Sequence, residues 1–144
     1  MTALRQGPSG PAIIPAVLLA SVSGSPAASA LATLASARSQ GGISVSANYI
    51  RVTQPGLYKL TGVVDVLQSV SANQYLGSRL EDGTQARNVE MPLNDGGTVQ
   101  GNFPVTLVNL FNITDPATQG IAIRNESAAG IVISSGSILV EQVG

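Results

Sequence analysis

The feature that most constrains this 144-residue chain is a series of short β-like segments that begins at Ile43. Turn-forming dipeptides such as Asp82-Gly83 and Asp115-Pro116 separate the segments, and no helical period lies between them. Strands at this spacing predict an all-β fold, an antiparallel jelly-roll sandwich of about eight strands, over residues 43–144. The expected strands are 43–53, 57–69, 74–80, 85–91, 98–102, 105–113, 120–125 and 129–141.

The strands are apolar on both faces. In the segment 105–113, Leu107 and Phe111 alternate with Val108 and Leu110. A half-solvated antiparallel strand has a polar second face. We therefore expect one face to fill the core and the other to lie in a subunit interface; the alternative is a set of interior strands buried within one larger sandwich. The candidate trimer-interface residues are Tyr58, Val108, Leu110, Phe111, Ile131, Ile133 and Leu139.

The low charge of the chain points the same way. Charged residues make up 10% of the sequence, against roughly 25% in an ordinary soluble domain. A surface so poor in charge suggests burial against other chains. The net charge of -1 argues against binding to nucleic acid or to a membrane surface.

The first third of the chain is nearly uncharged, since residues 1–48 contain only Arg5 and Arg38 as charged residues. We expect residues 1–42 to form an N-terminal extended arm that lies against its own domain, a sister subunit or a larger assembly. A cleaved signal peptide is the alternative for the apolar run 12–22. The arm residues expected to bind the assembly are Ile13, Ile14, Val17, Leu18, Leu19, Leu31 and Leu34.

One short helix is predicted within this arm, over residues 26–38. Ser25 suits the N-cap, Pro26 suits the first helical position, and Gly41 can close the helix. About twelve residues are marginal as an isolated helix. The helix would therefore pack either around a symmetry axis or on its own β domain.

The sequence holds no recognisable enzyme constellation. It has no histidine and no cysteine, the residues behind most acid–base and thiolate-metal sites. Glu81-Asp82 is expected in a solvated turn. We predict no enzyme activity, no catalytic residue, no cofactor and no metal; calcium held by turn carboxylates such as Asp115 is the alternative. Glycosylation sequons at Asn112 and Asn125 fit chance occurrence at this composition.

Two segments resemble a known superfamily. Val52-Thr-Gln-Pro-Gly-Leu-Tyr-Lys-Leu-Thr61 resembles the strand–turn–strand of the tumour-necrosis-factor/complement globular-head jelly rolls, and Ser135-Gly-Ser-Ile-Leu-Val-Glu-Gln-Val143 resembles their closing strand. Bacterial spore-surface trimers and viral head-fibre or capsid decoration proteins are most similar in style. The resemblance covers roughly residues 49–143. It implies a compact homotrimer and carries over no catalytic residue.

These features together predict a structural protein. We expect a homotrimeric phage capsid decoration or cement protein on the outer capsid surface of the virion, anchored by its arm to the major capsid protein. The alternatives are a receptor- or glycan-binding head of a viral fibre or of a filament on a spore or cell surface, and a secreted tumour-necrosis-factor-like ligand.

Overall fold

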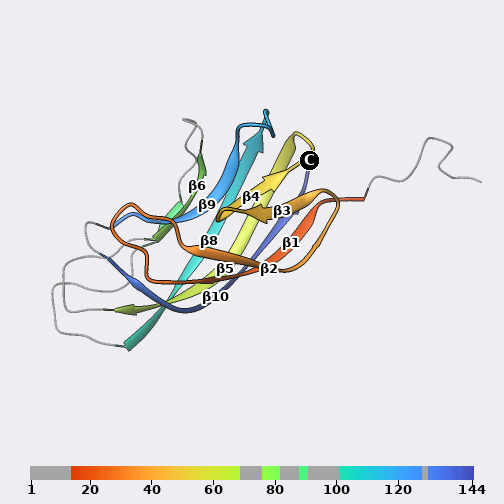
Figure 1. Ribbon diagram of the computed structural model, residues 1–144. Helices are drawn as coiled ribbons and strands as arrows, with labels where there is room; N and C mark the ends of the chain where they lie inside the picture. The colour runs from red at the N-terminus through yellow and green to blue at the C-terminus, as the bar shows by residue number, and fades with distance from the viewer. Residues whose placement is uncertain (1–13, 69–75, 82–87, 91–100, 128–129) are drawn as a thin grey trace, which may run out of the picture.

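The structure is a computed structural model that describes residues 14–68, 76–81, 88–90, 101–127 and 130–144. These residues form ten strands and no helix (Figure 1). None of the described residues belongs to a helix that could cross a membrane. The strands are β1 (Val17–Ser23), β2 (Thr33–Gln40), β3 (Ile43–Ser46), β4 (Tyr49–Val52), β5 (Gly56–Gln68), β6 (Leu76–Glu81), β7 (Asn88–Glu90), β8 (Gly101–Ile113), β9 (Gly120–Asn125) and β10 (Val132–Gln142).

The strands form two antiparallel five-stranded sheets. Sheet A has the order β2-β1-β10-β5-β8, and sheet B has the order β3-β4-β9-β6-β7. The longest pairing joins β5 to β8 over their full lengths, from Gly56 opposite Ile113 to Gln68 opposite Gly101. The predicted all-β jelly-roll sandwich is confirmed.

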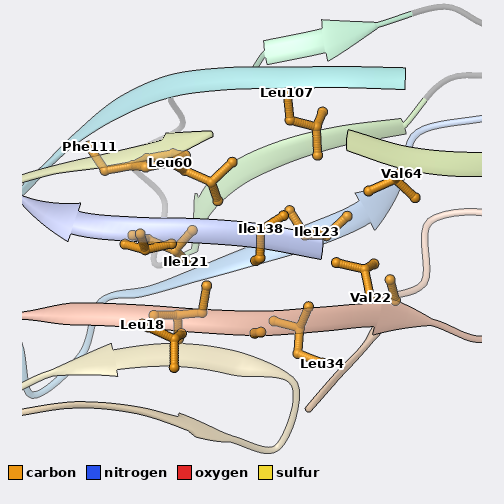
Figure 2. Close-up of a cluster of buried hydrophobic side chains, with 14 of the residues drawn as sticks. Leu18, Val22, Leu34, Leu60, Val64, Leu107, Phe111, Ile121, Ile123 and Ile138 are labelled. Atoms are coloured by element: carbon orange, nitrogen blue, oxygen red, sulfur yellow. The ribbon is translucent and has the colours of Figure 1, made fainter. Parts of the chain in front are cut away.

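An aliphatic core lies between the two sheets. Leu18, Leu60 and Ile138 of sheet A are fully buried together with Ile121 and Ile123 of sheet B (Figure 2). Burying each such side chain contributes about 1.5–3 kcal/mol. The core therefore holds the two sheets face to face and leaves each sheet with one outward face.

Most predicted strand boundaries agree with the structure, and three predicted segments differ. The segment 43–53 is two strands, because Ala47 and Asn48 adopt positive φ (51° and 65°) and turn the chain back on itself. The segments 98–102 and 105–113 belong to one strand, β8, as far as the described residues show. Pro104 does not interrupt β8, since β8 is an edge strand and proline lacks only a donor.

The predicted helix over residues 26–38 is wrong. Residues 33–40 form β2, which pairs with β1 along its whole length. Local propensity favoured a helix, but tertiary pairing outweighs so short a helix. Gly41, expected to end that helix, has positive φ (76°), as does Gly42 (79°), and the two glycines turn the chain from β2 into β3.

The residues assigned to an extended arm lie in the sandwich from residue 14 onward. β1 sits inside sheet A, between β2 and β10, and it buries Leu18, Ala20 and Val22 in the core. The loop after β1 then runs beside β9, where Asn125 N donates to Ala30 O (2.9 Å). This segment therefore completes both sheets, and the boundary expected after residue 42 falls in the glycine turn. Residues 1–13 lie outside the described residues.

Candidate interaction faces

The outward face of sheet A carries the largest set of exposed apolar side chains among the described residues. Val108 and Leu110 of β8 are 52% and 51% exposed, although both lie in the middle of a long strand. Their neighbours on β5, Leu57, Val63 and Leu67, are also exposed. Leu19 of β1 and Val132 of β10 extend the same face across four adjacent strands.

Strand register places these side chains in rows across the sheet. One row runs from Val108 through Thr61 and Leu139 to Leu19. A parallel row, two residues further along each strand toward the edge where β1 begins and β10 ends, runs from Leu110 through Lys59 and Glu141 to Val17. We call the outward side chains of β1, β10, β5 and β8 the apolar face. It is broken by small hydroxyl residues and a few charges, and it has no described covering layer.

Three of the seven predicted interface residues lie on the apolar face: Val108, Leu110 and the half-buried Leu139. The other four are core residues, each no more than 5% exposed, so they cannot contact another subunit. These are Tyr58, Phe111, Ile131 and Ile133. The error is one of parity, since neighbouring residues of a strand face opposite sides.

Tyr58 shows why the inward position is fixed. Its ring is fully buried, and its hydroxyl donates to Gln54 O at 2.7 Å, in the turn that precedes β5. Burial raises the pKa of the Tyr58 hydroxyl above its ordinary value of 10.0. Tyr58 thus stabilises the strand–turn–strand element from the core side.

The predicted arm residues divide among three environments. Leu18 and Leu34 are buried in the core, so they do not serve as contacts for an assembly. Ile14 and Leu19 are exposed, and Leu19 belongs to the apolar face. The remaining three are Val17 and Leu31, which are half-buried, and Ile13, which lies outside the described residues.

The interface predicted from the sequence omitted five exposed residues of the apolar face, namely Leu19, Leu57, Val63, Leu67 and Val132. Leu19 had been predicted only as an arm residue. The signal was present in β5, where Leu57, Val63 and Leu67 share one parity. The core residues Leu60 and Val64 share the opposite parity. When both the odd-numbered and the even-numbered residues of a strand are apolar, both faces of its sheet are expected to be buried.

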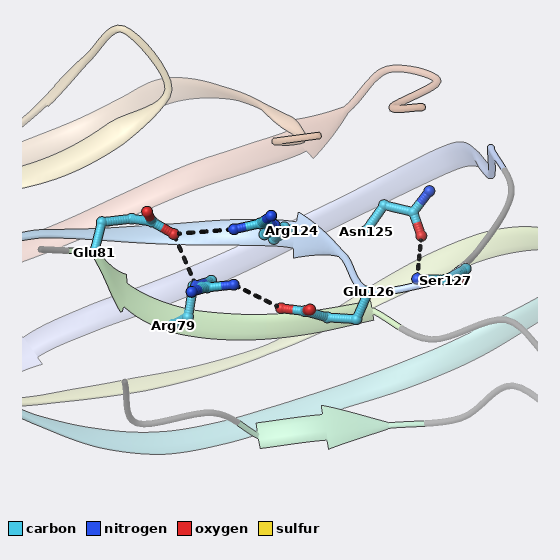
Figure 3. A network of polar contacts seen from close by, with 6 residues as sticks. All are labelled: Arg79, Glu81, Arg124, Asn125, Glu126 and Ser127. Carbon is cyan, nitrogen blue, oxygen red and sulfur yellow. Dashed lines mark hydrogen bonds and ion pairs between the residues drawn. The ribbon is translucent and has the colours of Figure 1, made fainter. Parts of the chain in front are cut away.

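The outward face of sheet B is charged. Arg79 of β6 lies at its centre, with Nε 2.8 Å from Glu81 Oε2 and a terminal nitrogen 3.5 Å from Glu126 Oε2 (Figure 3). Arg124 of β9 approaches Glu81 at 3.7 Å. The side chain of Arg79 is only 10% exposed. The expectation that Glu81 lies in a solvated turn is wrong, because it ends β6 inside this ion network.

Further along the same face, Arg51 of β4 lies over the ring of Tyr49, 5.0 Å from its centroid. It also donates to Thr118 O at 3.4 Å. Gly120 permits this arrangement, because a Cβ there would lie 3.2 Å from the Arg51 guanidinium. Sheet B therefore presents fixed, paired charges outward, in contrast to the apolar face of sheet A.

The two sequons lie in opposite environments. Asn125 is fully buried; its Nδ2 donates to Pro26 O (3.0 Å) and Ala27 O (3.1 Å), and its Oδ1 accepts from Ser127 N (2.8 Å, Figure 3). Asn112 is exposed on β8. The side chain of Asn125 is therefore a structural clamp between β9 and the β1–β2 loop.

Asp115 lies in a turn, as expected. Its carboxylate accepts from Ala117 N (3.2 Å) and from the Thr118 hydroxyl (3.0 Å), so it organises its own loop. Among the described residues no three histidine, cysteine, aspartate or glutamate side chains gather in a way that could hold a metal ion.

Sequence comparison finds no relatives: no protein-family model matches the chain, and no curated protein matches it. Structure comparison does find similar folds. Murine APRIL at pH 5.0 has a TM-score of 0.70 with 12% identity, over 90% of this chain and 100% of that one. The globular domain of zebrafish complement 1qA protein has a TM-score of 0.66 with 7% identity, over 90% of this chain and 98% of that one.

Each of these comparisons covers 90% of this chain. The resemblance noted for two short sequence segments therefore extends, as a likeness of fold, over most of the chain. The chain has the jelly-roll fold of the tumour-necrosis-factor and complement globular-head proteins.

Proposed function

We propose that this chain is the subunit of a homotrimeric jelly-roll head that acts by binding and display, not by catalysis. The observation that carries the proposal is the apolar face of sheet A. Monomeric proteins rarely expose so many large apolar side chains on one face, and exposed apolar patches usually mark contacts with other proteins. A second and third copy of the chain are the partners that the resemblance implies.

The size of the face suits this role. Four strands spaced about 4.8 Å apart, over about ten residues at about 3.3 Å each, cover about 600 Å². A standard protein–protein interface buries about 800 Å² on each partner. Val63 lies on this area in the middle of β5, and Val108 and Leu110 lie beside β5 on the edge strand β8.

The proposal is tested by placing a charge on the apolar face. Leu110→Asp should convert a trimer into monomers, because burying an unpaired carboxylate in an interface costs several kcal/mol. The matched control is Ser44→Asp, on the exposed outward side of β3 in sheet B. Sedimentation velocity should show a trimer for the wild type and the control, and a folded monomer for Leu110→Asp. A Leu110→Asp variant that remains a trimer would refute the use of this face.

For the biological role, we propose display on a phage capsid as a decoration protein bound to the major capsid protein. The low charge of the whole chain supports it, since a cement protein is covered on several sides. Pro15 and Gln142 lie at the same end of the sandwich, where Gln142 N donates to Ala16 O (2.8 Å). An attachment through residues 1–13 would therefore leave the opposite end of the head free.

A secreted ligand of the tumour-necrosis-factor type suits the same fold. Immunogold labelling of particles from the source culture distinguishes the two roles. Gold labels at regular sites on the capsid would support the decoration role. Detection of the protein only in free form in the medium would support the role of a secreted ligand. Deletion of residues 2–13 should abolish particle binding and preserve the oligomer if the attachment lies there.

A further inference from the structure

We propose that Lys59 of one copy forms an ion pair with Glu141 of the neighbouring copy, and that this pair sets how the apolar faces align. The inference rests on the proposed self-association through sheet A. It concerns specificity: an apolar face alone would allow several alignments, whereas a charge pair at a fixed position favours one.

The two residues lie on the two central strands of the apolar face, β5 and β10, toward the end of the face where β1 begins and β10 ends. Lys59 of β5 stands directly opposite Glu141 of β10 in the strand register. Leu110 of β8 flanks Lys59 on one side, and Val17 of β1 flanks Glu141 on the other. Lys59 is exposed and Glu141 is half-buried. A partner that covers Leu110 therefore also covers these two charges.

Neither charge has an ion-pair or hydrogen-bond partner among the residues that the structure describes. Side chains directly opposite on neighbouring strands have Cβ atoms about 5 Å apart, yet no ion pair joins Lys59 and Glu141, or either of them to another described residue. The sheet B network shows the contrasting case, in which Arg79 and Glu81 meet at 2.8 Å. Lys59 and Glu141 are thus available to a second copy.

The other charges of this face are differently placed. Asp65 of β5 accepts a hydrogen bond from the Ser135 hydroxyl (3.2 Å), and Ser135 lies opposite it on β10. Arg38 lies on the edge strand β2, opposite Leu19. Lys59 and Glu141 are therefore the only described pair of opposite charges on adjacent central strands of sheet A.

Association would bury both charges, and a buried charge without a partner is strongly unfavourable. Every copy carries one charge of each sign at the same place. Pairing Lys59 with the neighbour's Glu141 therefore satisfies both groups at each contact, in a closed ring as well as in a two-fold dimer. The alternative is that the two residues pair within one chain when the face is covered.

A charge exchange separates these alternatives. Lys59→Glu and Glu141→Lys should each weaken association about tenfold or more, because each places like charges across the interface. The double variant Lys59→Glu/Glu141→Lys should restore assembly, whether pairing is within or between chains. Circular dichroism of each single variant would establish that it is folded.

The decisive step mixes the double variant with mass-tagged wild type, allows subunits to exchange, and analyses the oligomers by native mass spectrometry. Pairing between chains makes every mixed contact repulsive, so the two forms should sort into separate homo-oligomers. Free mixing in binomial proportions would overturn the inference while leaving self-association intact. A wild type that is monomeric at every concentration would instead refute the proposed function itself.

Discussion

Replacing Asn125 with alanine tests whether the buried amide clamp holds the β1–β2 loop to sheet B. The side chain is fully buried; its Nδ2 donates to Pro26 O and Ala27 O, and its Oδ1 accepts from Ser127 N. Ala30 and Asn125 are also joined through the backbone. The clamp therefore fixes the loop that carries the chain from β1 to β2.

The expected loss follows from these bonds. Each net hydrogen bond contributes about 1 kcal/mol, and a buried N–H left without an acceptor, here that of Ser127, costs about 1–3 kcal/mol. Asn125→Ala should lower the free energy of unfolding by about 3 kcal/mol. With a urea m-value of about 2 kcal/mol per molar for a small domain, the unfolding midpoint should fall by about 1.5 M.

The chain supplies a matched control in Asn112, the other asparagine at the head of a sequon. Asn112 is exposed, so Asn112→Ala should change stability by less than about 0.5 kcal/mol. Both variants are best compared in the Leu110→Asp background at one protein concentration, because association would add to apparent stability. Equal midpoints for the two variants would show that Asn125 does not clamp the loop.

Three further changes have defined outcomes in the same urea assay. Arg79→Met should lower the free energy of unfolding by about 3 kcal/mol, because it leaves two partly buried carboxylates without their shared partner. Arg124→Met should lower it by under about 1 kcal/mol, because the Arg124 contact is 3.7 Å long and its side chains are one-quarter exposed. A larger loss for Arg124→Met than for Arg79→Met would contradict the network. Gly62→Ala should cost about 1–3 kcal/mol, because its Cβ would lie 2.4 Å from Ser137 O, and an unchanged midpoint would show that the strands can separate there. Because burial raises the folded pKa of Tyr58, stability should fall as pH rises above its ordinary pKa of 10.0. Tyr58→Phe should reduce this fall, and an undiminished fall would assign it to other groups.

The all-β class was predictable because turn chemistry and strand alternation are local signals. Gly120–Asn125 agrees with the predicted strand at both ends, and β5 agrees within one residue at each end. The predicted helix failed for the opposite reason. Residues 33–40 have fair helix propensity, but they lie beside β1, and the hydrogen bonds of that pairing decide their conformation.

The site was predicted only in part. A second apolar face could be inferred from β8, where Val108 and Leu110 alternate with core residues. Its extent could not, since Leu19 and Val132 reach the same face only through the order of strands in sheet A. The ion network was not predictable either, because Arg79 and Glu126 are far apart in sequence and meet only through the pairing of β6 with β9.

The central claim is that copies of this chain cover the apolar face of sheet A, and thiol accessibility tests it most directly. The chain has no cysteine, so Val63→Cys reports on sheet A and Ser44→Cys on sheet B. We expect Val63→Cys to react with a maleimide much more slowly than Ser44→Cys in concentrated protein, and at a comparable rate after dilution to monomers. Equal rates in concentrated protein would contradict the account, because Val63 would then be open to solvent in the assembly.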